Sequence, residues 1–142
     1  MIIEKLRHSD LSSYKELMDD CFGGSNELDY YKEHYSDRAQ YEIIVAKEDN
    51  KIIGSITYYK IELFTFSFQP AIEIFNVAVL KEHREKKIAK NLFEYIIDIA
   101  KNNGYKSIFL TCLDNAFDAH NLYESIGFKK VSSRKYNLSL KE

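Results

Sequence analysis

A cluster of cations directly follows an apolar segment in the middle of the chain, and this arrangement could bind phosphate. The apolar segment runs from Ile72 to Leu80. The basic residues after it are Lys81, His83, Arg84, Lys86, Lys87 and Lys90. Where a buried strand leads into a helix, the backbone N–H groups and the helix dipole attract anions. We therefore expect a phosphate-bearing ligand at this turn; the alternative is a solvated helix end.

A tyrosine further along the chain could carry out proton chemistry beside that ligand. Tyr123 lies in the segment Leu122 to Phe128, which reads as the end of a short helix. A phenol has a pKa of about 10, so it is protonated at neutral pH and suits a general acid. The chain has 11 tyrosines, so a packing role on the inner face of the helix is the alternative.

The apolar spacing predicts the elements that position these residues. In the first half, alternation and intervals of three and four predict a strand, two helices and a β-hairpin. These elements cover about residues 2–6, 11–21, 26–35, 41–47 and 52–64. Gly23 and Gly24 separate the two helices.

The second half predicts a parallel pair of strands joined by a helix. The strand from Ile72 and the strand Ser107 to Leu113 are nearly unbroken apolar runs, which is typical of strands covered on both faces. A helix from about Arg84 to Asn103 connects them as a right-handed crossover. A short helix, which Asn115 can cap, and a final strand from Val131 to Leu140 follow. We predict one α+β domain, residues 1–142, whose mixed sheet is antiparallel at the start and parallel in the middle.

Size and composition favour a globular, cytoplasmic protein. With 142 residues, 45% of them hydrophobic, the chain can form a core without disulfides or metal. Cys21 and Cys112 fit a reducing compartment, and the histidines show no metal-ligand spacing, so no metal site is expected. No signal sequence is evident at the start, and no apolar run approaches the ~20 residues that span a bilayer.

The charges are unevenly distributed along the chain. Residues 1–50 carry six more acidic than basic residues, and residues 51–142 carry four more basic than acidic ones, with a net charge of −2. A basic half suits an anionic cofactor and an acidic half suits a cationic substrate; ordinary surface patterning is the alternative for the acidic half. The net charge disfavours nucleic acid and anionic membrane as partners.

Two motifs in the second half resemble the GNAT superfamily, the Gcn5-related N-acetyltransferases. After the strand residues Val77-Ala78-Val79, the segment Arg84-Glu85-Lys86-Lys87-Ile88-Ala89 resembles the family's Q/R-x-x-G-x-G/A turn. Ala119-His120-Asn121-Leu122-Tyr123-Glu124-Ser125-Ile126-Gly127-Phe128 resembles its closing A-x-x-L-Y-E-x-x-G-F motif. Lys87 stands where the family usually has glycine; a helical position would tolerate it and would gain a cation beside the phosphates.

The resemblance implies acetyl-CoA as co-substrate and a set of residues that contact it. Strand main-chain groups would contact the pantetheine arm, between two parallel strands that splay apart, and the basic turn would hold the pyrophosphate. The implied residues are Val77, Ala78, Val79, Arg84, Lys86, Lys87, Ile88, Ala89, Lys90 and Asn115. For Asn115, a simple helix cap is the alternative.

The resemblance also implies catalytic roles. Tyr123 would protonate the departing thiolate. Glu73 is the acid on the strand before the basic turn and is a candidate base, with Asn76 orienting a water, or solvent itself, as the other possibilities. Strand alternation would place Glu73 on one face with Phe75 and Val77.

The predicted function is transfer of acetyl from acetyl-CoA to a primary amine by direct attack. Neither cysteine has an obvious activating base, although Cys112 could lie near the thioester. The acceptor is a small molecule or a peptide, and the run Tyr30 to Tyr35 falls where relatives build substrate-binding walls. A non-catalytic module that binds acetyl-CoA or a partner is the alternative, and the choice between monomer and homodimer stays open.

Overall fold

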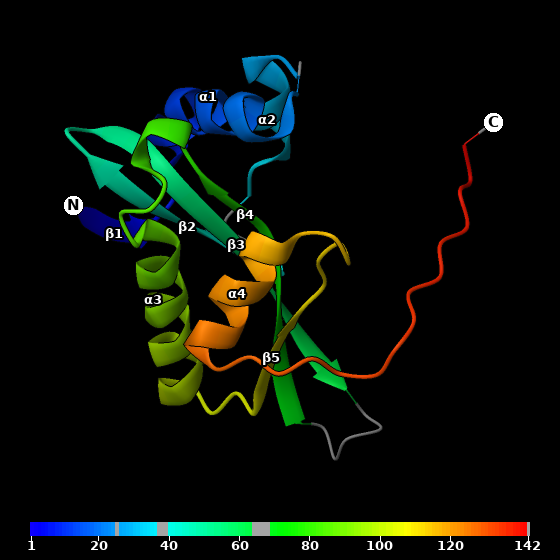
Figure 1. The fold of residues 1–142 in the computed structure, drawn as a ribbon. Coiled ribbons are helices and arrows are strands. Elements are labelled where there is room, and N and C mark those ends of the chain that lie inside the picture. Colours follow the sequence, from blue (N-terminus) through cyan, green and yellow to red (C-terminus); the bar gives the residue numbers. More distant parts are fainter. Residues whose placement is uncertain (25, 37–39, 64–68, 142) are drawn as a thin grey trace. The chain divides into compact units, whose positions relative to one another are not determined.

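Five strands form one mixed sheet in the order β1-β2-β3-β4-β5 (Figure 1). The computed structural model describes residues 1–24, 26–36, 40–63 and 69–141. The strands are β1 (Ile2–Lys5), β2 (Tyr41–Glu48), β3 (Lys51–Leu63), β4 (Gln69–Val79) and β5 (Ser107–Leu110). The pairs β1–β2, β2–β3 and β3–β4 are antiparallel, whereas β4–β5 is parallel. The predicted α+β class and the change from antiparallel to parallel pairing are confirmed.

The chain divides into two compact units. The first unit, Met1–Thr111, contains the whole sheet, and the second is Cys112–Glu142. Helices of the first unit are α1 (Leu11–Phe22), α2 (Leu28–His34) and α3 (Ile88–Asn102), with 3-10 turns η1 (His8–Asp10) and η3 (Lys81–His83). The second unit contains α4 (Phe117–Ile126).

Helix α3 covers one face of the sheet in the first unit (Figure 1). Its buried residues recur at helical spacing: Ile88, Leu92, Phe93, Ile96 and Ala100. A Cβ on Gly54 of β3 would lie 2.8 Å from the side chain of Ile88, so the start of α3 lies directly against the strand. The glycine therefore permits this close approach.

Because of this contact, Gly54→Ala is expected to destabilise the fold by about 1–3 kcal/mol through overpacking. The added Cβ would also lie 3.3 Å from the carbonyl oxygen of Ala78 and from Leu92 Cδ1. Urea unfolding measures the change. The matched control is Gly24→Ala, whose Cβ meets only Asp19 Oδ1 at 3.4 Å. Equal stability of the two variants would contradict the prediction. In an Ile88→Ala background, which lacks the Cγ2 atom that the added Cβ would meet, Gly54→Ala should cost less.

Helix α1 packs against the opposite face of the sheet. Its buried residues Leu11, Tyr14, Leu17 and Met18 follow the predicted spacing. Burial raises the pKa of the Tyr14 hydroxyl to about 12, and Thr57 of β3 is among the groups that influence it. Thr57 and α1 therefore lie on one side of the sheet, and Gly54 and α3 lie on the other.

Two predicted boundaries are wrong. The crossover helix begins at Ile88, four residues after Arg84, because two residues before it have positive φ. The second parallel strand ends at Leu110, where pairing with β4 stops, and does not reach Leu113. Residues 65–68 of the predicted link before β4 lie outside the described part of the chain.

The second unit departs most from expectation. The N-cap of α4 is Ala116, without a side-chain cap, so the reading of Asn115 as the cap is wrong. The predicted final strand, Val131 to Leu140, is also wrong, because the segment has no regular secondary structure. All its residues are exposed, and the described residues of its unit include no strand that could supply a hydrogen-bonded ladder.

Among the described residues, no helix combines the length and apolar character needed to cross a bilayer.

Candidate active site

A β-bulge interrupts β4 between Phe75 and Ala78, within the strand that the sequence predicts before the basic turn. Thr57 of β3 pairs with Phe75, but Ser55, two residues earlier, pairs with Ala78. Asn76 and Val77 therefore lie opposite one residue of β3, and Asn76 has a φ of +53°. Asparagine tolerates this conformation better than most residues. Bulges of this kind bend a strand and redirect its side chains, often beside active sites.

The bulge changes the faces of β4 that simple alternation predicts. Residues directly opposite one another in a ladder share a face. By this register Phe75 and Ala78 lie on the face of Thr57, together with Glu73, which pairs with Tyr59. The expectation that Val77 shares this face is wrong, because the extra residue shifts the alternation by one position.

The parallel ladder between β4 and β5 ends just before the bulge. It runs from Ala71 opposite Ser107 to Ile74 opposite Leu110, whereas β4 continues to Val79. Within the described residues, the part of β4 from Phe75 to Val79 has no ladder partner on its β5 side. The main-chain groups of Phe75 to Ala78 on that side therefore have no strand partner and could bind an extended ligand.

The basic turn follows the open part of β4. The Nε of Arg84 donates to the Val79 carbonyl oxygen at 3.1 Å, and the Sγ of Cys21 donates to the same oxygen at 3.4 Å. The side chain of Arg84 thus fastens the turn to the end of β4. The side chains of Lys86 and Lys87 are exposed, so their charges face solvent.

The start of α3 presents unpaired backbone donors. The first helical hydrogen bond runs from Asn91 N to Lys87 O at 3.0 Å, so the N–H groups of Ile88, Ala89 and Lys90 precede it and have no acceptor within the helix. The N-cap, Lys87, provides no side-chain cap, and the first turn contains no acidic residue. Both features favour an anion at this helix start.

Lys87 adopts a left-handed conformation, with φ +62° and ψ +21°. The reading of this residue as an ordinary helical position is therefore wrong. The position is one that glycine occupies without strain, whereas a side chain there costs about 1–2 kcal/mol. The sequence offered a signal for this, because the resembled motif has glycine at this position.

We expect Lys87→Gly to stabilise the fold by about 0.5–1 kcal/mol, the relief of strain less the added freedom of the unfolded chain. Chemical denaturation measures the gain. Lys86→Gly removes the same charge at a neighbouring residue without positive φ and should not stabilise. Lys87→Ala removes the charge but keeps the Cβ, so a gain in that variant would show that charge, and not φ, is responsible.

Glu73 and Asn76, the two candidates for the proton-accepting step, line the same pocket. This pocket, of about 290 Å³, is lined by Gln40, Tyr59, Lys60, Ile61, Glu73, Phe75 and Asn76. It lies on the β3–β4 surface at the bulge. The structure thus brings the two candidates together within the first unit, although their catalytic roles stay predictions.

Sequence reasoning placed Phe75 on the face of Glu73 but missed the other aromatic residue of this pocket, Tyr59. The Tyr59 ring lies 5.5 Å from that of Tyr41 and 5.2 Å from that of Phe75, between centroids. The predicted alternation of Glu73 and Phe75 is confirmed by the register. The cross-strand neighbours could not be found without the register.

Tyr123 and Asn115 belong to the second unit. Tyr123 lies on α4, and its ring contacts that of Phe128 with centroids 6.1 Å apart. Gly127 ends the helix with a φ of +119°. Burial, and secondarily charge at Cys112, raise the pKa of the Tyr123 hydroxyl above its ordinary value. The hydroxyl is therefore protonated at neutral pH, as a general acid must be.

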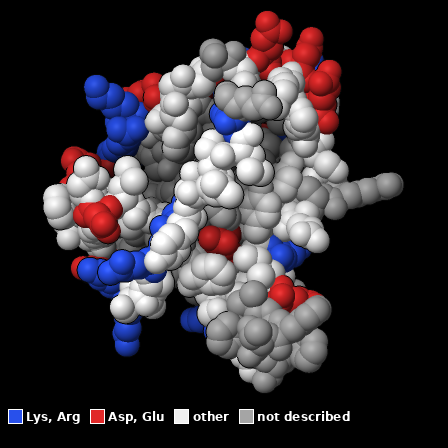
Figure 2. All heavy atoms as spheres, turned by 90° about the vertical axis from the view of Figure 1, so that its right-hand side faces the viewer, with Lys and Arg blue, Asp and Glu red and all other residues white. Residues whose placement is uncertain are grey.

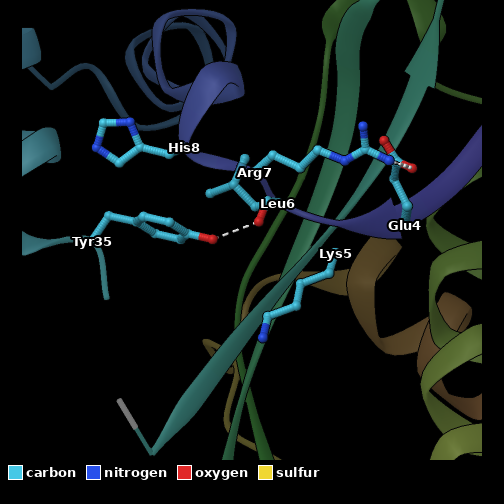
Figure 3. A pocket seen from close by; sticks show the side chains of 6 residues that line it. All are labelled: Glu4, Lys5, Leu6, Arg7, His8 and Tyr35. Carbon is cyan, nitrogen blue, oxygen red and sulfur yellow. Dashed lines mark hydrogen bonds and ion pairs between the residues drawn. The ribbon is translucent and has the colours of Figure 1, made fainter. Parts of the chain in front are cut away.

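A larger pocket lies near β1 and contains none of the predicted catalytic or cofactor-binding residues, although Tyr35 belongs to the run predicted to form substrate-binding walls (Figure 3). Its volume is about 590 Å³, and its lining residues are Glu4, Lys5, Leu6, Arg7, His8 and Tyr35. The Tyr35 hydroxyl donates to the Leu6 carbonyl oxygen at 2.5 Å, and Arg7 pairs with Glu4 at 3.0 Å. Glu4 also pairs with Lys47, which lowers its pKa. Because these polar and charged groups already pair with one another, this pocket is a weaker candidate for a ligand site than the pocket at the bulge.

Acidic side chains gather at the top of the face in Figure 2, the level at which α1 and α2 lie in Figure 1. This agrees with the excess of acids in residues 1–50. In the part of the chain that the structure covers, no three His, Cys, Asp or Glu residues are grouped to hold a metal ion.

The fold and the open, bulged β4 beside a basic helix start define an acetyltransferase-like domain. The model of the acetyltransferase (GNAT) family matches residues 11–128, and the chain belongs to this family.

Known proteins agree with this assignment. Human N-acetyltransferase 8B is 30% identical over 87 residues, which cover 61% of this chain and 38% of that protein. The chain thus matches well under half the length of this relative.

Among solved structures, a ribosomal-protein-alanine N-acetyltransferase from Brucella melitensis biovar Abortus 2308 has a TM-score of 0.81 at 23% identity, covering 97% of this chain and 100% of the other. A transcriptional regulator from Bacillus halodurans C-125 has a TM-score of 0.83 at 23% identity, covering 96% and 99%. At these identities the likeness shows the fold alone.

Proposed function

We propose that this chain transfers an acetyl group from acetyl-CoA to a primary amine by direct attack. The observation that carries the proposal is the juxtaposition, within one unit, of the unpaired edge of β4 and the uncapped start of α3. The first suits the amides of a pantetheine arm, and the second suits a pyrophosphate. Family membership and the names of the relatives support acetyl transfer in general terms.

The residues that would hold acetyl-CoA fall into two groups. Val77, Ala78 and Val79 would offer main-chain groups along the open edge. The turn would supply the amides of Ile88, Ala89 and Lys90 and the charges of Lys86 and Lys87. Arg84 would act partly by holding the turn against Val79. Asn115 would contact the arm from the loop after β5.

Acetyl-CoA supplies an acetyl group activated as a thioester. The acceptor nitrogen attacks the carbonyl carbon, so an N–C bond forms and the C–S bond breaks. Glu73 would accept the proton that the amine loses, directly or through a water held by Asn76. Tyr123 would donate its proton to the departing sulfur.

One observation favours a second candidate, a module that binds acetyl-CoA or a partner without turnover. Lys87 replaces a glycine in a left-handed position, and its Cβ restricts how closely a phosphate can approach. Such a module would bind acetyl-CoA weakly, or bind only a partner, and would release no thiol with any amine.

Two measurements test these candidates. Acetyl-CoA is titrated by calorimetry and thermal unfolding, where a ligand at 100 times its Kd should add about 2.7 kcal/mol. Free-thiol release is then followed over a panel of amines. Binding of acetyl-CoA with thiol release supports the transferase, and binding without thiol release supports the non-catalytic module. If acetyl-CoA does not bind, this chain is neither a transferase nor a module that uses this coenzyme.

A further inference from the structure

An aromatic surface lies beside the bulge, on the same side of the sheet as α1. Tyr41, Tyr59 and Phe75 form a continuous chain of ring contacts across β2, β3 and β4. Tyr59 and Phe75 are 39% and 43% exposed. The first contact is tilted and the second is edge-to-face, so rings that are this exposed present surface to a ligand.

One carboxylate lies within this surface. The register places Glu73 between Tyr59 on β3 and Phe109 on β5, all on one face. Phe109 is itself 37% exposed. A carboxylate flanked by aromatic rings is the environment that holds an ammonium group, by charge and by cation–π attraction.

The other charges near the pocket are already paired. Lys60, which also lines it, pairs with Glu42 at 3.2 Å, and Lys5 lies 3.9 Å from the same carboxylate. Among the described residues, no cation pairs with Glu73, and no acid of α1 or α2 lines the pocket. The pocket therefore offers one unpaired negative charge.

We propose that this pocket selects a monoamine with an aromatic or bulky apolar body, with its ammonium group at Glu73 and its body against Tyr59 and Phe75. This inference rests on the proposed function, since the amine is the acetyl acceptor. A polycationic acceptor is disfavoured, because its additional ammonium groups would find no second carboxylate in the lining and would lie near the Lys60 ammonium group.

The probes are 2-phenylethylamine, spermidine and the neutral analogue 2-phenylethanol. Calorimetry without acetyl-CoA measures their binding to the full chain, and thiol release with acetyl-CoA measures kcat/KM for the two amines. We expect 2-phenylethylamine to bind about tenfold more tightly than either other probe, as one carboxylate contact and one ring contact imply. We expect its kcat/KM to exceed that of spermidine.

Variants then separate ring contact from general apolar contact. Phe75→Ala should weaken 2-phenylethylamine binding about tenfold, and Phe75→Leu should weaken it less, because leucine keeps apolar volume but not the ring. The control is Phe22→Ala on α1, which removes a ring that is 54% exposed and lies outside the pocket. Circular dichroism establishes that each variant is folded.

The outcomes distinguish the two proposals. If 2-phenylethylamine binds through Phe75 but no thiol is released, acetyl transfer is wrong and the ligand class stands. If spermidine equals or exceeds 2-phenylethylamine in binding and turnover, or if Phe75→Ala behaves like Phe22→Ala, the ligand class is wrong. Acetyl transfer would then stand on thiol release alone.

Discussion

In the Tyr123→Phe variant, kcat for acetyl transfer is expected to fall by about 10²- to 10⁴-fold, the usual contribution of general acid catalysis. The substitution keeps the ring and its contact with Phe128, so it removes only the hydroxyl. Acetyl-CoA affinity, measured by calorimetry, should change little. The loss therefore belongs to the step in which the thiolate leaves.

The pH dependence gives a second readout of the same group. Burial raises the pKa of Tyr123 above its ordinary value of 10.0, so the hydroxyl keeps its proton at neutral and mildly alkaline pH. In the wild type, kcat should hold its plateau through pH 10 and fall only as the pH rises through this raised pKa. In Tyr123→Phe that alkaline fall should disappear.

The control for this prediction is Tyr136→Phe in the same unit. Tyr136 is 86% exposed, and its hydroxyl has no assigned role, so kcat should be unchanged. If Tyr123→Phe retains wild-type kcat and the wild-type alkaline limb, Tyr123 is a packing residue and the proton comes from elsewhere.

The sequence predicts the order of elements well because their periodicities are strong. The apolar spacing of α3 and the apolar run of β4 each depend on many residues, so single deviations matter little. The prediction of a final strand was wrong for the opposite reason. The alternation from Val131 to Leu140 is local, and a strand also requires a partner that no local pattern supplies.

The details of the site were less predictable because they depend on backbone geometry. An asparagine, Asn76, within an apolar run is compatible with a bulge. It is equally compatible with an exposed position in a regular strand, so the sequence alone does not reveal the bulge. The left-handed conformation of Lys87 runs against the preference of lysine, so propensity alone gives the wrong answer. Such disagreements between local preference and structure are common at functional sites.

Glu73→Gln should lower kcat at neutral pH by about 10²-fold, the lower range for general base catalysis. Glutamine keeps the size of the side chain but cannot accept the proton of the amine. Saturating acceptor isolates kcat from the binding role of the same carboxylate. The deficit should shrink as the pH approaches the pKa of the amine, about 10 for a lysine-like group, because solvent then removes the proton.

Two further variants decide between the possible proton acceptors. Glu73→Asp keeps a carboxylate and should recover part of kcat, whereas Asn76→Ala should lower kcat only if that amide orients a water. Asn76 lines the pocket with Glu73, so both effects are measurable with one acceptor. If Glu73→Gln stays within twofold of wild type at every pH, solvent is the base. In that case the carboxylate serves recognition alone, and its loss should appear in KM and not in kcat.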